Sequence, residues 1–356
     1  MKIFIFFVKI LLLLALLIAL VLGGIILYAT ITDYRPDEKT SIEAVGNGTQ
    51  KIAKTDLSFL IWNIGFCGLG AEADFFYDGG KMVRSPEEKV ANYFSKVKDF
   101  LNTKKQTDFV MLQEVDRGSK RSYYTEEFEN INKLFPNYNG AFGKNYDVQF
   151  VPLPFTNPLG RVHSGLATYA PYQSTEITRY QFPGNFSFPK GLFFLDRCFL
   201  LQRFPVFNGK DLIVINTHNS AYDDGTLKQK QMKYLKDILV KEYEKGNYVI
   251  VGGDWNQTPP GFDNLTFLKK GGQDPIEQIA VEFDYMPKGW IWAYDASTPT
   301  NRKLNEPYNA VRTFTTVIDF FLISPNIRLK KVEGIDLDFQ ASDHQPVYME
   351  VQLQEE

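Results

Sequence analysis

Two of the three histidines in this chain follow apolar runs and sit beside polar partners. His218 ends the run NTH, and His344 ends the run SDH. Histidine is the side chain whose ordinary pKa lies nearest neutral pH, so it is the usual carrier of protons in catalysis. A lone histidine is more often a surface or core group. Two in such contexts predict acid–base chemistry, and we expect His163, which lacks such a context, to be peripheral.

Acidic and amide side chains also follow apolar runs. They are Asn63, Glu114, Asp254 and Asn256. Taken singly, Asn63 could cap a turn and Glu114 could be a surface charge, but the run FVMLQ before Glu114 indicates a buried neighbourhood, where an unpaired carboxylate is costly. Carboxylate and amide oxygens are the ligands that Mg²⁺ prefers. The pattern predicts a divalent cation in front of a phosphate.

Six short motifs stand in one order along residues 54–356. They are IWNI (61–64), LQE (112–114), NTH (216–218), GDWN (253–256), VIDF (317–320) and SDH (342–344). In this order the chain resembles the endonuclease/exonuclease/phosphatase superfamily, which includes nucleases, neutral sphingomyelinases and inositol-polyphosphate phosphatases. The resemblance implies hydrolysis of a phosphate ester by in-line attack of water, and no activated Ser or Cys nucleophile accompanies the motifs.

The resemblance also implies a role for each catalytic residue. His344 would take a proton from water, with Asp319 orienting its ring, and His218 would stabilise or protonate the phosphate or the leaving oxygen. Asp254 is a rival for the role of base, because some members of the superfamily use the aspartate of this motif. Asn256 would donate a hydrogen bond to the phosphoryl oxygen.

Five further residues complete the expected site. By the same resemblance, Asn63, Glu114 and Asp343 would hold Mg²⁺, with Mn²⁺ as the alternative metal; Asp343 could instead complete the network around the histidine. Arg197 and Asn145 would bind the substrate phosphate; an ordinary solvated strand position is an equal alternative for Arg197.

Short apolar segments alternate with two helical segments. We expect a helix from the capping box at Ser85 to about residue 104 and another over 227–245, stopped by Gly246. The strands expected are 57–63, 109–113, 164–169, 193–202, 212–216, 248–252, 317–323 and 347–353. Many are apolar throughout, which is typical of sheets covered on both faces. They predict an α/β fold, a four-layer α/β/β/α sandwich of two packed mixed sheets, which the superfamily also implies.

The first 30 residues contain Lys2 and Lys9 and no acid, and residues 10–28 are uncharged. This length favours an uncleaved transmembrane helix over a cleaved signal peptide or a buried core helix. The early lysines predict a single-pass protein with its N-terminus inside and the rest of the chain extracytoplasmic. Residues 31–54 are expected to form a polar stalk, and residues 55–356 the catalytic domain.

Charge and cysteine content constrain the class of protein. Without the two lysines of the anchor, 37 basic residues face 42 acidic ones, a net charge of −5. This balance mildly disfavours a general nucleic-acid binder. Cys67 and Cys198 are the only cysteines, and the sequence allows either a disulfide or two buried thiols.

The motifs predict a phosphate ester as the substrate, but they do not indicate which alcohol is esterified. A phospholipid head group and an extracytoplasmic nucleic acid are the two substrates considered, and a catalytically silent, membrane-tethered binding protein is the third alternative. Besides the substrate and the bilayer that holds the N-terminal helix, no protein partner is implied. The aromatic segment 285–292 could dip into a lipid interface, but an ordinary packed loop is the favoured interpretation.

Overall fold

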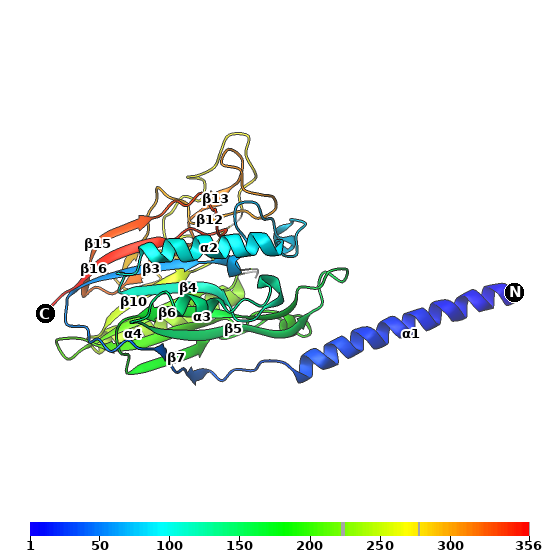
Figure 1. Cartoon of the computed structure of the whole chain (residues 1–356), viewed down its shortest axis with the longest axis horizontal. Helices are drawn as coiled ribbons and strands as arrows, with labels where there is room; N and C mark the ends of the chain where they lie inside the picture. Colours follow the sequence, from blue (N-terminus) through cyan, green and yellow to red (C-terminus); the bar gives the residue numbers. More distant parts are fainter. Residues whose placement is uncertain (222–224, 277, 356) are drawn as a thin grey trace.

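Two β-sheets pack face to face in the computed structural model, with helices on their outer faces and one helix projecting away from the domain (Figure 1). The structure describes residues 1–221, 225–276 and 278–355. The predicted four-layer sandwich is confirmed.

The first sheet has seven strands, with β3 and β4 parallel and every other neighbouring pair antiparallel. Its order is β15 (Ile327–Gly334), β16 (Val347–Leu353), β3 (Asp56–Asn63), β4 (Phe109–Asp116), β6 (Gly160–Ala170), β5 (Asn139–Val151) and β2 (Val45–Gly46). Because β3 and β4 run in the same direction, their carboxyl ends meet at one edge.

The second sheet also has seven strands, and here β9 and β10 are the parallel pair. Its order is β1 (Lys39–Ser41), β7 (Glu176–Gln181), β8 (Cys198–Pro205), β9 (Asp211–His218), β10 (Tyr248–Asp254), β14 (Asp319–Ile323) and β11 (Ile291–Ala293). A separate ribbon pairs β12 (Asn301–Arg302) with β13 (Thr315–Thr316).

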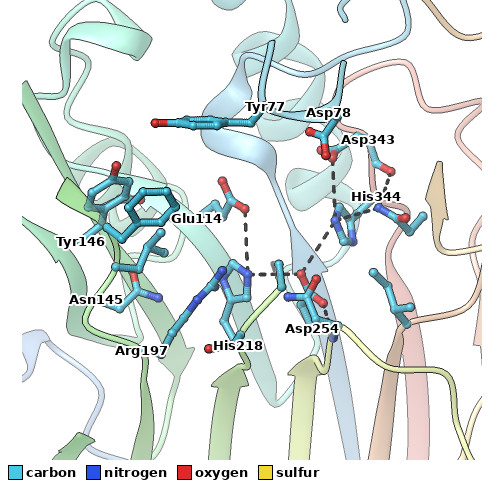
Figure 2. Close-up of a pocket in the computed structure, with 18 of the residues that line it drawn as sticks. Tyr77, Asp78, Glu114, Asn145, Tyr146, Arg197, His218, Asp254, Asp343 and His344 are labelled. Atoms are coloured by element: carbon cyan, nitrogen blue, oxygen red, sulfur yellow. Dashed lines mark hydrogen bonds and ion pairs between the residues drawn. The ribbon is translucent and has the colours of Figure 1, made fainter. Parts of the chain in front are cut away.

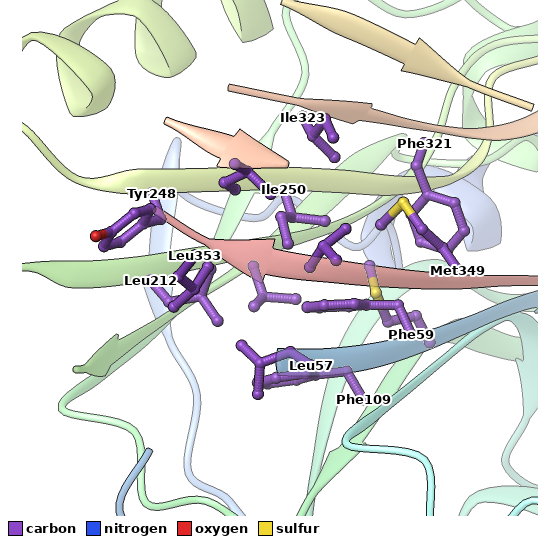
Figure 3. Close-up of a cluster of buried hydrophobic side chains, with 14 of the residues drawn as sticks. Leu57, Phe59, Phe109, Leu212, Tyr248, Ile250, Phe321, Ile323, Met349 and Leu353 are labelled. Atoms are coloured by element: carbon purple, nitrogen blue, oxygen red, sulfur yellow. The ribbon is translucent and has the colours of Figure 1, made fainter. Parts of the chain in front are cut away.

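An apolar core fills the space between the sheets (Figure 3). Strand β3 shows why both faces of the first sheet are apolar. Phe59 and Ile61 point into this core, whereas Leu60 and Trp62 pack on the other side among helical side chains. Each such side chain, when fully buried, contributes about 1.5–3 kcal/mol to folding. The sequence of a strand that is covered on both faces is therefore continuously apolar.

Helices α2 (Glu87–Thr103) and α3 (Glu127–Asn132) cover the first sheet, and α4 (Thr226–Glu244) covers the second. The two long helices were predicted. Short 3₁₀ turns occur at η1 (Gly65–Cys67), η2 (Phe76–Asp78), η3 (Lys120–Ser122) and η4 (Lys190–Phe193).

Two local predictions were wrong. The expected capping box at Ser85 does not form, because its hydroxyl donates to the Gly68 carbonyl at 2.6 Å and Pro86 precedes the helix instead. The strand expected over 193–202 begins only at Cys198, since η4 and an irregular stretch occupy the preceding residues.

The segment 31–54 was expected to be a stalk, and much of it belongs to the domain. Its strand β1 pairs with β7 and its strand β2 pairs with β5, so the segment extends one edge of each sheet. Ile52 is buried in the core between the sheets. Backbone pairing at open sheet edges explains how a polar sequence becomes ordered here.

Burial decides between the alternatives for the two cysteines and for the segment 285–292. Cys67 and Cys198 are separate, buried free thiols. In the segment 285–292, Tyr285, Met286 and Trp290 are buried in the apolar cluster under α4, which excludes the lipid-dipping loop and confirms the packed one. The N-terminal helix α1 (Lys2–Ile31) is long and apolar enough to cross a membrane, judged by length and composition.

Candidate active site

The strand ends bring most of the predicted site residues together. His218 ends β9 and lies directly beside Asp254, which ends the parallel strand β10. Asp254 is in turn opposite Asp319, the first residue of β14. Asn63 ends β3 in the facing sheet, and its side chain reaches Asp254. Of these four side chains, those of His218 and Asp254 line a cavity of about 340 Å³, and Figure 2 shows them there beside His344.

His344 and Asp319 form a buried pair. The Nδ1–H of His344 donates to Asp319 Oδ2 at 2.8 Å, and both residues are at most 6% exposed. The Asp319 backbone N–H is held by Thr300 Oγ1 at 3.1 Å. On the other side of the ring, the amide nitrogen of Asn301 lies 3.0 Å from Nε2, which accepts this hydrogen bond only in the neutral imidazole. The ring is therefore fixed with Nε2 directed away from Asp319.

Charges around His344 raise its pKa. Burial alone would lower the pKa of this imidazole, but the carboxylates of Asp319, Asp343 and Asp254 outweigh burial and raise it well above its usual value. Burial raises the pKa of Asp319 to about 6, although His344 opposes this shift. Desolvation likewise raises the pKa of Asp343 to about 7.

His218 has the opposite surroundings. Its Nε2 lies 3.3 Å from Asp254 Oδ2 and 4.0 Å from Glu114 Oε1. Burial lowers its pKa well below the usual value, and the positive charges of Arg197, His344 and Arg121 lower it further. We conclude that His218 is neutral at pH 7. A neutral imidazole in this place can donate a hydrogen bond into the cavity without carrying a charge.

Both carboxylate oxygens of Asp254 accept hydrogen bonds from neighbouring site residues. Its Oδ1 accepts from the backbone N–H of Asn256 at 2.9 Å, and its Oδ2 accepts from the Asn63 amide at 3.0 Å. Asn256 has a left-handed backbone (φ 50°), and its amide donates to the carbonyl of Asn219 at 2.9 Å. In this conformation the Asn256 amide is thus engaged with the backbone.

A β-bulge positions Glu114. The register of β4 against β6 shifts between Leu112 and Val115, and Glu114 has a left-handed φ of 54°. A bulge re-aims a side chain that would otherwise follow the strict alternation of the strand. Here the carboxylate turns into the cavity, 3.8 Å from Arg121 Nη1. Glu114 was expected at a strand end, and it lies instead within β4.

The predicted phosphate contacts also line the cavity. Asn145 on β5 is 1% exposed, and its amide nitrogen has no hydrogen-bond partner among the described residues. Arg197 lies directly before β8 rather than within it, because that strand begins one residue later. Figure 2 shows Asn145 and Arg197 on the His218 side of the cavity. A buried polar amide directed at a cavity is suited to an oxyanion.

Three contributors were missed by the sequence analysis. Arg121 pairs with Asp116 at 2.9 Å and stacks on Phe66 at 3.8 Å, so a buried guanidinium borders the cavity. Asn301 holds the Nε2 side of His344, and Tyr146 lies next to Asn145. None is part of a recognisable motif. The charged run DRGSKR, which begins at Asp116 at the end of β4, was the only signal in the sequence for Arg121.

The donor set fits a divalent cation. One oxygen each of Asp254 and Asp319 and one nitrogen of His344 lie within 4.8 Å of one another. Asp319 Oδ2 and His344 Nδ1 are, however, already joined to each other. The carboxylates of Glu114, Asp254 and Asp343 line the cavity and could hold a cation without breaking that pair. Asn63, as oriented, offers these carboxylates its NH₂ group, while its oxygen accepts from the Gly65 N–H at 3.0 Å.

Comparison with known proteins identifies the relatives of this fold. The family model described as Endonuclease/Exonuclease/phosphatase matches residues 60–344. A search of curated proteins found no match.

Solved structures share the fold at low sequence identity. An endonuclease/exonuclease/phosphatase from Beutenbergia cavernae DSM 12333 is 17% identical, with a TM-score of 0.53 over 85% of this chain and 72% of its own. D. rerio TDP2 complexed with a single-strand DNA product is 16% identical, with a TM-score of 0.51 over 83% and 99%. The human Nocturnin catalytic domain with bound sulfate is 14% identical, with a TM-score of 0.52 over 88% and 97%.

Proposed function

The chain belongs to the endonuclease/exonuclease/phosphatase family, and from that premise we propose that it is a membrane-anchored, Mg²⁺-dependent phosphodiesterase. Members of this family are phosphoesterases that generally depend on a divalent metal. The observation that carries the proposal is the Asp319–His344 pair, 2.8 Å apart, at the edge of a carboxylate-lined cavity. Mn²⁺ is the alternative metal.

His344 is assigned as the general base. Its Nε2 takes a proton from the attacking water, and Asp319 stabilises the resulting imidazolium through the Nδ1–H bond. Asp254 is the weaker candidate, because its carboxylate lines the cavity beside Glu114 and Asp343 and is assigned with them to the cation.

His218 and the residues beside it in the cavity are assigned to binding the substrate phosphate. With its lowered pKa, His218 donates a hydrogen bond to a phosphoryl or leaving oxygen more readily than it transfers a proton. Arg197 and Asn145 bind the remaining oxygens, and Asn256 joins them once its amide leaves the Asn219 carbonyl. Glu114, Asp254 and Asp343, with Asn63 after rotation of its amide, would hold the cation. When bound, the metal neutralises phosphoryl charge in the transition state.

The orientation of the N-terminal helix would determine the compartment of the catalytic domain. Helix α1 would span the bilayer once, with Lys2 and Lys9 on the cytoplasmic side and the catalytic domain outside. Phospholipid head groups and extracellular nucleic acid are both accessible from that position. The nuclease alternative is favoured by D. rerio TDP2, whose structure carries a single-strand DNA product. The third alternative, a silent binding protein, is disfavoured because the base, phosphate and cation residues converge on one cavity.

Turnover by the full chain in detergent or nanodiscs tests the proposal. With Mg²⁺, we expect hydrolysis of bis-p-nitrophenyl phosphate, and His344→Ala should lower kcat by about 10²–10⁴-fold, the usual contribution of a general base. Because His163 lies outside the cavity, His163→Ala is the matched control and should retain activity. Sphingomyelin and plasmid DNA as substrates separate the two phosphodiesterase alternatives. Absence of hydrolysis of every phosphoester by a folded protein would favour the binding protein.

A further inference from the structure

The last turns of α1 pack against the catalytic domain. Residues 1–24 of the helix are exposed, whereas Ala29 is only 6% exposed and Ile25, Ile26 and Thr30 are partly covered. The helix contacts η4 and β5. The attachment of the domain to the end of the helix is therefore a packed contact as well as a covalent link.

The length of the apolar run places this contact at the membrane boundary. Lys9 is the last charged residue of the helix, so the hydrocarbon-spanning part begins after it. About 20 residues at about 1.5 Å each cross a hydrocarbon layer of about 30 Å. Counted from Ile10, that span ends near Ala29, the residue on which the domain packs. The parts of the domain beside Ala29 must then lie at head-group depth.

Large apolar side chains are exposed on these parts of the domain. Phe150, Leu153 and Phe155, in and after the end of β5, are 37%, 41% and 67% exposed. Phe188, which lies two residues before η4, is 70% exposed. Both elements touch α1. We name these four side chains the apolar rim. Figure 1 shows α1 leaving the domain on the side where the loop after β5 projects.

We propose that the apolar rim inserts into the bilayer leaflet next to the end of α1 and holds the cavity against the lipid head groups. Exposed aromatic and aliphatic side chains cost free energy in water and gain it at a membrane interface. This inference rests on the proposed anchoring, and its occupant is the lipid surface.

The chain segment that carries Phe188 of the apolar rim also borders the cavity. Phe186, Phe194 and Leu195, from the chain segment that contains η4, line one wall of it. A second hollow, lined by Tyr34, Phe188 and Leu192, shares Phe186 with that wall and reaches residues 33–36, which follow α1. One segment of chain thus borders both the membrane helix and the catalytic cavity. A phosphodiester in a phospholipid head group is the substrate that this arrangement reaches.

Site-directed fluorescence tests the contact without requiring activity. Phe155→Cys in the full chain can be labelled selectively, because both native cysteines are buried. In nanodiscs containing nitroxide-labelled phospholipid, we expect a label at 155 to shift to shorter emission wavelength and to lose most of its intensity. Val311→Cys is the matched control, since Val311 is 73% exposed and lies between β12 and β13, which Figure 1 shows at the top of the domain, away from α1.

Equal quenching at both positions, or water-like emission at 155, would overturn the proposal. A label at 155 that becomes shielded only on adding another protein would point to a protein partner and would likewise refute it. As a second measurement, replacing the four rim residues by Ser should lower turnover of vesicle phospholipid at least tenfold and leave bis-p-nitrophenyl phosphate hydrolysis unchanged. Failure of the proposed catalysis would abolish both activities in the unmodified chain and leave the fluorescence result intact.

Discussion

His218 and His344 share a neighbour and yet have opposite electrostatics. Asp254 Oδ2 lies 3.3 Å from one ring and 3.8 Å from the other. His344 also has Asp319 and Asp343 beside it, whereas His218 is buried near Arg197 and Arg121. Two titratable groups whose pKa values are driven apart are a recurrent property of acid–base sites. Their protonation states follow from which charges each ring faces.

The three histidines should titrate in a defined order. In the cation-free protein we expect His344 to have the highest pKa, His163 to lie below its usual value because of burial, and His218 to be lowest. At pH 7 His344 is then charged and His218 neutral. Imidazole nitrogen NMR resolves this directly, since the chain has only three such rings. A His218 that keeps its proton at higher pH than His344 would contradict the assignment.

Replacing Asp319 should move the pH profile. A general base works only when deprotonated, so activity rises with pH through its pKa, and a raised pKa displaces that rise to higher pH. Asp319→Asn removes the nearest carboxylate, lowers the pKa of His344 and therefore shifts the ascending limb of kcat/KM to lower pH, with a reduced maximum. A fall in rate with an unmoved limb would make Asp319 merely structural. Asp147→Asn, whose carboxylate pairs with Lys144 outside the cavity lining, is the control.

Residues in motifs were predictable, and their supporting partners were not. His344 and Asp319 are 25 positions apart and were paired through the family resemblance. Asn301 contacts His344, and Arg121 lies beside Glu114. Both contacts exist only in the folded chain. The bulge that turns Glu114 into the cavity is a backbone irregularity with no distinctive residue, so the strand pattern could not indicate it.

At the scale of elements, close packing of β9 against β10 holds Asp254 beside His218. Gly253 has φ +143°, and an added Cβ would lie 2.1 Å from the Thr217 carbonyl oxygen. A side chain there cannot be accommodated by rotation, because the obstacle is backbone. The glycine before Asp254 is thus required by strand geometry.

Gly253→Ala should disrupt activity through this contact. We expect β10 to move away from β9 and the alignment of Asp254 with His218 to be lost, with kcat falling by about 10² or more, as misplacement by about 1 Å can produce. Gly209→Ala is the matched control, because Gly209 also has a positive φ of 78° but nothing lies within 4 Å of its added Cβ. Equal loss of activity in the two variants would contradict this explanation.

The elements themselves were predicted unevenly, and the reason is burial. Apolar runs such as β3, β9 and β10 are covered on both faces and were recognised. Strand β15, which carries three lysine or arginine side chains at an edge, and the 13-residue β5, which alternates polar and apolar residues, were missed. Edge strands owe their order to hydrogen bonding with a neighbour, which is not encoded in local hydrophobicity.

At the scale of the whole molecule, the clustered carboxylates would couple the proposed cation binding to folding. Glu114, Asp254 and Asp343 converge only in the folded chain, so a ligand for them stabilises that state. We expect Mg²⁺ at about 100 times its Kd to add about 2.7 kcal/mol to the free energy of unfolding. Calorimetry of the full chain should show a raised Tm.

The same measurement on a variant locates the ion. Glu114→Gln should remove most of the Mg²⁺-dependent rise in Tm, because it removes a carboxylate from the cavity. Glu72→Gln, an exposed carboxylate that pairs with Lys89 outside the cavity, should leave the rise intact. A rise that is equal in both variants would place the ion elsewhere.

Strands β1 and β2 pair with different sheets, so proteolysis before them and proteolysis after them have different consequences. Only residues 32–38 separate α1 from β1, and the chain from Lys39 onward is already part of the sandwich. A protease acting within 32–38 would separate the complete sandwich from α1. Cleavage after Gly46 would instead strip both sheets of an outer strand and expose two bare edges prone to self-association.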